Sequence, residues 1–287
     1  VLTGSPRGGR NLRLLIGYGL AIASILILFY FVDFDAGLAL RALSSIQPGW
    51  ALFASILIIL HLWLAAVAFA FSLRQWDQPI RSESVRAAWF ASLLTKYLPG
   101  GVWNPVTRGG LLVAEGASLR SVTLASLLEL ASTLASTVVL GLFLWSVASS
   151  TEPGPQYLLL IAGVVSLFLL WVVVLALLRF GRDSVTIAAC YAGSMAAYAL
   201  AYTALFRPPD LIGFCAELFA ATAAGIAAVP VPGGLGVRES LLSLSVDADA
   251  VSGAFALAIA ARALIFGVEF GLSSLQIWRY SRIRNPE

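Results

Sequence analysis

Long runs of apolar residues alternate with short polar segments along almost the whole chain. A helix needs about 20 predominantly apolar residues to cross a bilayer. The first run follows three arginines, as in a signal peptide, but it is longer than such a segment, and Asp33 and Asp35 stand where small cleavage-site residues would be expected. We therefore expect six membrane-spanning helices, at approximately residues 14–32, 50–73, 118–148, 157–179, 185–206 and 251–278.

Two further apolar regions, 83–115 and 211–246, are each interrupted by the tripeptide Pro-Gly-Gly. The interruptions leave arms of roughly 13 to 19 residues, which are short for full spans. Each region is therefore expected to form a re-entrant helical hairpin. Its turn must be sheltered by protein or by a wet cavity, because unpaired backbone groups cannot face lipid.

The two Pro-Gly-Gly elements lie 133 residues apart in a chain of 287, which is about half its length. Each half contains two spans, one interrupted hairpin and one further span. Because three spans is an odd number, the second half must be inserted upside down relative to the first. We predict an all-α polytopic membrane protein with a single transmembrane domain, built from six spans and two re-entrant hairpins as an inverted-topology repeat. The expected parts are a tail at 1–13, a first repeat at 14–148, a connector at 149–156, a second repeat at 157–279 and a tail at 280–287.

Composition agrees with this pattern, since 60% of the residues are hydrophobic and 11% are charged. The net charge of +3 is modest and gives no indication of nucleic-acid binding. Basic residues favour one side of the predicted topology, so the positive-inside rule predicts that both termini are cytoplasmic. That side carries twelve arginines, against Arg41 and Arg207 on the other: Arg7, Arg10, Arg13, Arg74, Arg81, Arg86, Arg120, Arg179, Arg182, Arg279, Arg282 and Arg284.

Several charged residues lie inside the apolar segments. A charge at the centre of a span costs about 2.5–3.5 kcal/mol on insertion scales, so these side chains should face a cavity or one another. Arg262 and Glu269 are seven residues apart and share a helical face, and the 133-residue offset maps Glu129 onto Arg262. Two interpretations stay open: a structural ion pair that joins the halves, or a path for substrate. The predicted buried network comprises Lys96, Glu115, Glu129, Glu217, Arg262 and Glu269.

The Pro-Gly-Gly elements suggest anion sites. Glycine permits backbone angles closed to other residues, and proline ends the preceding arm. The arm that follows begins with free N–H groups and the positive end of the helix dipole, which suits a phosphate or carboxylate. Arg108 and Arg238 add positive charge near each turn. The alternative is that the glycines only let helices pack closely.

Other chemistry has weaker support. A single histidine, His61, and two separated cysteines, Cys190 and Cys215, do not predict a metal site, and we predict no cofactor. The segments 33–35 and 247–249 match the Asp-x-Asp pattern of metal-using glycosyltransferases, but the chain lacks the large loops that hold a sugar donor.

At the segments YLPGGVWNPVTRGG and VPVPGGLGVRES, the chain resembles the flippase-like integral membrane family named for the transmembrane region of lysylphosphatidylglycerol synthases. The resemblance covers nearly the whole chain, and PGGLGVRE is its more specific motif. It implies a role in moving lipids such as aminoacylated phospholipids, lipid-linked sugars or hopanoids between leaflets. No part of the chain resembles the synthase half of fused members, which leaves the lipid open. The residues matched to the motifs are Pro99, Gly100, Gly101, Arg108, Pro232, Gly233, Gly234, Arg238 and Glu239.

The leading hypothesis is a flippase or translocase for an anionic or phosphate-bearing lipid in a bacterial or archaeal cytoplasmic membrane. A separate lipid-synthesising enzyme is an expected partner, and the oligomeric state is left open. The alternatives are a membrane-embedded enzyme that modifies lipids and a transporter of a small soluble anion. A transporter is favoured over an enzyme.

Overall fold

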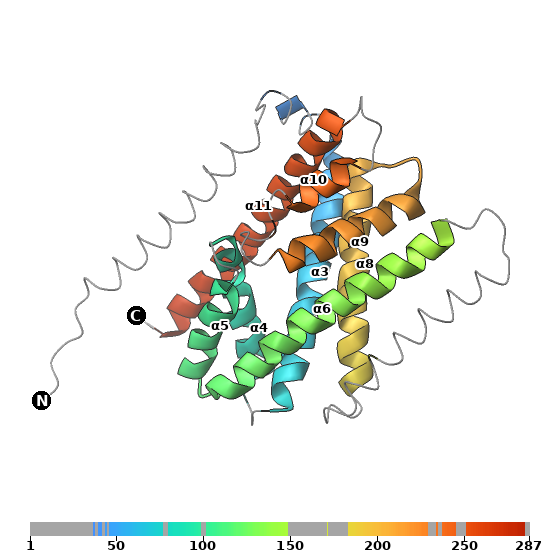
Figure 1. Cartoon of the computed structure of the whole chain (residues 1–287). Helices are drawn as coiled ribbons and strands as arrows, with labels where there is room; N and C mark the ends of the chain where they lie inside the picture. Colours follow the sequence, from blue (N-terminus) through green and yellow to red (C-terminus); the bar gives the residue numbers. More distant parts are fainter. Residues whose placement is uncertain are drawn as a thin grey trace, which may run out of the picture.

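The computed structural model describes residues 46–76, 80–98, 102–148, 183–228, 237–244 and 251–284, together with Gly37, Leu40, Arg41, Ser44, Trp171 and Gly234. This part of the chain is helical and contains no strand (Figure 1). Its elements are α3 (Pro48–Arg74), α4 (Ser82–Ala91), the 3₁₀ helix η1 (Leu93–Tyr97), α5 (Trp103–Ala114), α6 (Leu119–Ala148), α8 (Asp183–Phe206), α9 (Leu211–Ala227), α10 (Val237–Leu244) and α11 (Val251–Arg284).

Four of the described helices are long and apolar enough to cross a membrane: α3, α6, α8 and the Ala254–Trp278 part of α11. They coincide with the expected spans at 50–73, 118–148, 185–206 and 251–278. The all-α architecture is therefore confirmed for this part of the chain, and its long apolar helices agree with a membrane protein. The expected spans at 14–32 and 157–179 lie outside the described residues.

Helices α3 and α8 pack side by side and antiparallel at the centre of the molecule (Figure 1). One end of the pair is joined by an ion pair of 2.8 Å between Arg74 Nη2 and Asp183 Oδ2. At the other end, the guanidinium of Arg207 lies 6.0 Å from the centre of the Trp50 ring. Small residues let the two helices approach closely. The buried alanines are Ala54, Ala65, Ala66, Ala68 and Ala70 on α3, and Ala188, Ala197, Ala199, Ala201 and Ala204 on α8.

Helix α6 crosses this pair and packs against α9 (Figure 1). A Cβ atom added at Gly141 would lie 3.1 Å from Cβ of Phe219, so the glycine permits the close approach of the two helices. The face of α6 turned inward also carries the buried hydroxyl residues Ser132, Ser136 and Thr137. Thr137 donates to the carbonyl of Thr133 at 2.7 Å and thereby satisfies its hydroxyl within the helix.

Short helices flank both Pro-Gly-Gly elements. Helices α4, α5, α9 and α10 have 10, 12, 17 and 8 residues. The sequence predicted one continuous arm before the first element, but α4 ends at Ala91 and the tighter helix η1 follows. Ser92 and Thr95 account for the change, because their hydroxyls bind the carbonyls of Trp89 and Ser92.

Candidate functional site

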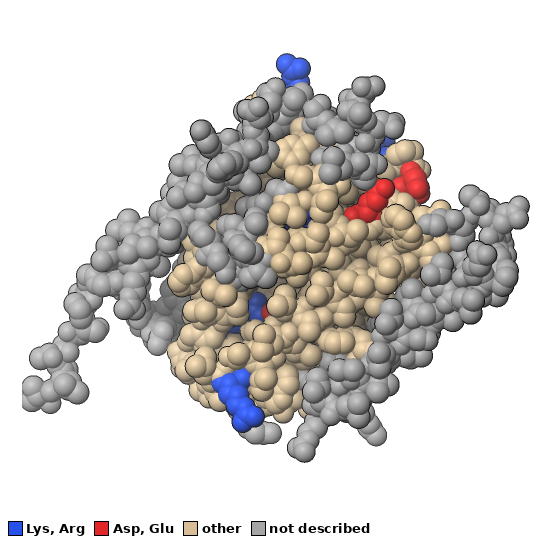
Figure 2. All heavy atoms as spheres, viewed as in Figure 1, with Lys and Arg blue, Asp and Glu red and all other residues tan. Residues whose placement is uncertain are grey.

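The described residues enclose a cavity of about 740 Å³ between the two halves of the chain. Its lining residues come from α3, α4, η1, α5 and α6 in the first half and from α8, α9, Gly234 and α10 in the second. Figure 2 shows a few charged atoms in a small recess of the face, apart from the charged side chains at the edges of the molecule. The titratable side chains that line the cavity are His61, Lys96, Arg108, Glu129 and Arg238.

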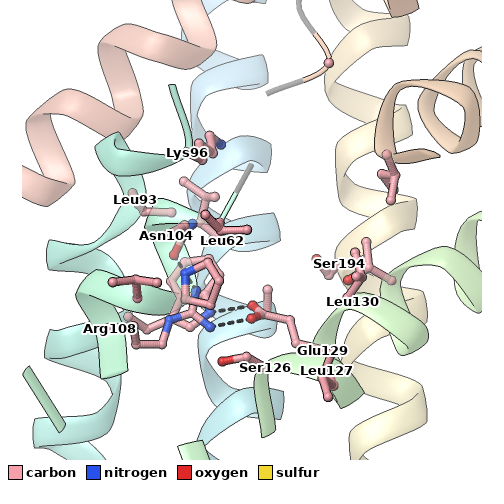
Figure 3. A pocket seen from close by; sticks show the side chains of 18 of the residues that line it. Leu62, Leu93, Lys96, Asn104, Arg108, Ser126, Leu127, Glu129, Leu130 and Ser194 are labelled. Atoms are coloured by element: carbon pink, nitrogen blue, oxygen red, sulfur yellow. Dashed lines mark hydrogen bonds and ion pairs between the residues drawn. The ribbon is translucent and has the colours of Figure 1, made fainter. Parts of the chain in front are cut away.

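Arg108 and Glu129 join α5 to α6 across the cavity wall. Arg108 is only 2% exposed, and its Nη1 forms an ion pair with Oε2 of Glu129 (Figure 3). Its Nη2 donates to Oδ1 of Asn104 at 2.9 Å, one turn earlier on α5. The indole Nε1 of Trp89 donates to Oε1 of Glu129 at 2.6 Å. Both carboxylate oxygens are therefore hydrogen-bonded, which offsets the cost of placing this charge at membrane depth.

Aromatic rings complete the surroundings of Arg108. Its guanidinium carbon lies 4.4 Å from the ring centre of Phe69 and 5.3 Å from that of Trp89. A cation at such distances is attracted by the negative face of the ring. The planar guanidinium is thus held in one orientation by rings, by Asn104 and by Glu129.

A second charged group links η1 to α11. Lys96 Nζ forms an ion pair of 2.5 Å with Oε1 of Glu269, and the hydroxyl of Tyr97 donates to Oε2 at 2.9 Å. The guanidinium of Arg262, two turns before Glu269 on α11, lies 5.4 Å from the centre of the Tyr97 ring. Glu269 is 2% exposed whereas Lys96 is 28% exposed. The ammonium group of Lys96 therefore lines the cavity, whereas its counterion Glu269 is buried and does not.

A third group is built around Arg238 at the start of α10. Arg238 Nη2 forms an ion pair of 3.3 Å with Oε1 of the adjacent Glu239. Its Nη1 donates to the hydroxyl of Tyr198 at 2.5 Å, and its guanidinium lies 5.9 Å from the Tyr202 ring centre. Its Nε atom has no hydrogen-bond partner among the described residues. Arg238 lines the cavity while Glu239 does not. In this group, as in the pair of Lys96 and Glu269, the cation faces the cavity.

His61 and Ser194 meet where α3 crosses α8, on the cavity wall. The Nδ1 atom of His61 lies 2.9 Å from the carbonyl oxygen of Ser194 and 2.8 Å from its hydroxyl. The Ser194 hydroxyl in turn donates to the carbonyl of His61 at 3.0 Å. The imidazole of His61 is therefore hydrogen-bonded to Ser194 on the neighbouring helix.

One side of the cavity is apolar and open. Five apolar residues line the cavity and are each more than half exposed: Val102 at the N-cap of α5, Val106 on α5, and Leu119, Leu127 and Leu130 on α6. In a membrane such side chains face hydrocarbon. The cavity thus combines cationic side chains inside with an apolar mouth between α5 and α6.

The structure places the predicted site residues unevenly. Arg108, Arg238, Lys96, Glu129 and Gly234 line the same cavity. Glu239, Glu269 and Arg262 are buried close behind it in the contacts given above. Outside the described residues lie Pro99, Gly100, Gly101, Pro232 and Gly233, as well as the Asp-x-Asp segments at 33–35 and 247–249.

Two residues of the predicted buried network lie elsewhere. Glu115 is exposed at the C-terminal cap of α5, because α5 ends at Ala114 and its last turn leaves the packed region. Glu217 is half-buried on α9 and does not line the cavity. Within the described part of the chain, no group of three or more His, Cys, Asp or Glu side chains could hold a metal ion.

Sequence reasoning missed the neutral partners of the charges, namely Trp89, Asn104, Tyr97 and Tyr198. Only Asn104 carried a usable signal, because it stands four residues before Arg108 on the same helix face. The other partners come from different elements. No family model, curated protein or solved structure matches the chain.

Proposed function

We propose that this protein is a flippase or translocase that moves an anionic, phosphate-bearing lipid between the leaflets of a cytoplasmic membrane. The observation that carries the proposal is the cavity, in which Lys96, Arg108 and Arg238 line the interior and exposed valines and leucines line the mouth. The head group enters the cavity while the hydrocarbon chain stays in lipid between α5 and α6. A small soluble anion needs the cations but not the apolar mouth.

The two halves are proposed to form an inverted repeat, and the helix bounds support it. Shifted by the 133 residues that separate the Pro-Gly-Gly elements, α3, α4, α5 and α6 fall on α8, α9, α10 and α11 to within four residues at each end. We include the two spans at 14–32 and 157–179 as the first span of each repeat. The hairpins correspond to α4–η1–α5 and α9–α10.

The contact between His61 and Ser194 supports the same symmetry. These residues are themselves 133 positions apart, so they are equivalent in the two repeats. Their bonds are also reciprocal, since each side chain contacts the carbonyl oxygen of the other residue. Reciprocal contacts between equivalent positions are what a two-fold axis produces. We therefore place the pseudo-two-fold axis between His61 and Ser194, in the wall of the cavity.

The proposed orientation has both termini in the cytoplasm. Arg74 at the end of α3 and Arg120 at the start of α6 belong to the same end of the bundle, because Ser121 Oγ donates to the carbonyl of Trp76 at 3.3 Å. Arg207 lies at the opposite end of α8 from Asp183. This distribution supports a cytoplasmic side at the Arg74 end. Relative movement of the repeats then exposes the cavity to one leaflet after the other.

Lipid translocation by the purified protein tests this function. The protein is reconstituted in phosphatidylcholine vesicles that carry a trace of phosphatidylglycerol with a fluorescent acyl chain. Dithionite added outside destroys only label in the outer leaflet, unless lipid crosses. We expect protein-containing vesicles to lose label from both leaflets, and protein-free vesicles to lose only the outer label.

Two parallel measurements identify the substrate class. Uptake of radiolabelled glycerol 3-phosphate should be no faster than in protein-free vesicles. The zwitterionic analogue, phosphatidylcholine with the same label, should cross more slowly than phosphatidylglycerol. Lipid loss equal to that of protein-free vesicles contradicts the proposal, and glycerol phosphate uptake without lipid movement indicates a transporter of soluble anions.

A further inference from the structure

Glu129 is already paired with Arg108, the cation that an incoming head group needs. Oε2 of Glu129 is bound to Nη1 of Arg108, and both residues line the cavity (Figure 3). An anion that binds Arg108 therefore brings a second negative charge against the carboxylate. Two anions at one site disfavour each other, and protonation of the weaker acid removes the repulsion. A phosphate diester is a stronger acid than a carboxylic acid, so the proton goes to Glu129.

The described carboxylates near the cavity differ in their access to protons. The side chain of Glu129 is 19% exposed and lines the cavity. Glu239 and Glu269 are each 2% exposed and lie behind Arg238 and Lys96. Water in the cavity can therefore exchange a proton with Glu129, while the other two are shielded by their own cations.

The surroundings of Glu129 also suit its neutral form. Trp89 Nε1 donates to Oε1 at 2.6 Å, and a protonated carboxyl still accepts this bond at its carbonyl oxygen. When Oε2 is protonated, its O–H group is a hydrogen-bond donor on the side that faces Arg108. The guanidinium and the carboxylic acid together can donate to two oxygens of one phosphate.

We propose that Glu129 takes up one proton when an anionic head group binds Arg108, and releases it when the head group leaves and the ion pair with Arg108 re-forms. The inference rests on the proposed function, because it assumes that an anion reaches the cavity. The proton comes from cavity water and returns to it, so no other reactant is needed. Lipid movement is thereby coupled to proton movement.

Other titratable or charged groups face this region from the elements around α6. His61 on α3, Lys96 on η1 and Arg238 on α10 line the cavity, and Tyr191 on α8 interacts electrostatically with Glu129. Lys96 and Arg238 are paired with Glu269 and Glu239, so they do not take up the proton. Tyr191 is neutral and already carries its proton. His61 is the rival proton acceptor, although its Nδ1 is engaged by Ser194. On α9, Glu217 does not line the cavity.

Calorimetry of anion binding by the detergent-purified full chain tests the proposal. The probe is dihexanoyl phosphatidylglycerol, whose phosphate diester carries one negative charge. Titrations at one pH in two buffers of different ionisation enthalpy give the number of protons taken up. We expect close to one proton per probe bound in the wild type. The affinity should rise as the pH falls, by at most about tenfold for each pH unit.

Three variants assign the proton. Glu129→Gln should bind the probe without proton uptake and without dependence on pH, because the amide cannot ionise. Glu129→Asp should retain the uptake, and so should His61→Gln. Uptake that persists in Glu129→Gln, or disappears in His61→Gln alone, overturns the assignment to Glu129.

The number of protons taken up by the wild type tests the proposal without any variant, so the test holds even if a variant does not fold. Binding by the wild type without proton uptake overturns the inference and leaves the proposed function standing. Absence of binding by the wild type contradicts the proposed function itself, and the inference fails with it.

Discussion

Arg108 illustrates how one cation can be kept at membrane depth. Its guanidinium is 2% exposed, yet Glu129, Asn104 and the faces of Phe69 and Trp89 all contact it. An arginine suits this position because its planar fork binds a carboxylate and stacks on rings at the same time. Buried ion pairs contribute little net stability compared with apolar residues of similar size. A contribution to stability therefore does not account for this pair, and its place in the cavity wall agrees with the proposed function.

Breaking this pair on one side should cost more than removing it completely. Arg108→Leu leaves the Glu129 carboxylate with Trp89 but without its cation. We expect a loss of a few kcal/mol in stability, below the 3–5 kcal/mol of a fully buried pair, because Glu129 is 19% exposed. Arg108→Leu combined with Glu129→Leu should recover much of the loss. Thermal unfolding in detergent measures both, and a double variant no more stable than Arg108→Leu would count against the pairing.

The sequence predicted that these charges are buried, but not which residues pair with them. The burial of charges in a cavity followed from their cost in lipid. The sequence offset, however, mapped Glu129 onto Arg262, whereas the structure pairs Glu129 with Arg108 and Glu269 with Lys96. Spacing identifies equivalent positions in two repeats but not which side chains meet between elements. In the proposed repeat the offset places Leu241 at the position of Arg108, so this charge has no counterpart in the second half.

At the scale of elements, the join between α9 and α10 depends on Gly234. This residue has φ +65°, and a Cβ atom there would lie 2.7 Å from the carbonyl oxygen of Gly225. The absence of a side chain thus lets Gly234 lie directly against Gly225, near the end of α9. Gly225 also lies next to Arg238 on the cavity wall, since a Cβ atom added at Gly225 would lie 3.5 Å from Cβ of Arg238.

Replacing Gly234 by alanine should therefore disturb both packing and transport. The left-handed backbone alone costs about 1–2 kcal/mol for a residue with a side chain, and the clash with Gly225 adds to it. We expect a lower unfolding temperature and slower lipid translocation. Gly110→Ala is the matched control, since its added Cβ meets no atom within 4 Å. Equal stability of Gly234→Ala and Gly110→Ala would contradict this account of the turn.

The long helices were predictable and the short ones less so. The runs at 50–73 and 185–206 are apolar enough to identify spans from length alone, and α3 and α8 match them closely. Between Ala91 and Tyr97 the chain changes to a 3₁₀ helix because serine and threonine hydroxyls bind nearby carbonyls. Such local competition alters a helix without changing its hydrophobic pattern.

At the scale of the whole molecule, the cavity is lined by residues of both halves of the chain, which we propose to be related by the 133-residue offset. The proposed axis passes between His61 and Ser194, and the cations come from both halves: Lys96 and Arg108 from the first, Arg238 from the second. A head group that moves from one half to the other therefore stays near positive charge. Cations on only one half would bind an anion without giving it a path.

Translocation by variants that lack these charges tests the central claim most directly. Neutralising both members of a pair avoids a buried, unpaired charge, so the variants are Arg108→Gln with Glu129→Gln, and Arg238→Gln with Glu239→Gln. The control neutralises Arg74 and Asp183 in the same way, because this pair joins the end of α3 to the start of α8 near the surface and does not line the cavity. Each variant must remain folded in detergent before it is reconstituted.

The measurement is the initial rate at which labelled phosphatidylglycerol crosses the vesicle membrane. Loss of one charge-assisted contact should slow each cavity variant by about tenfold or more, while Arg74→Gln with Asp183→Asn keeps the wild-type rate. That result supports a head-group path between Arg108 and Arg238. Wild-type rates in both cavity variants would contradict it.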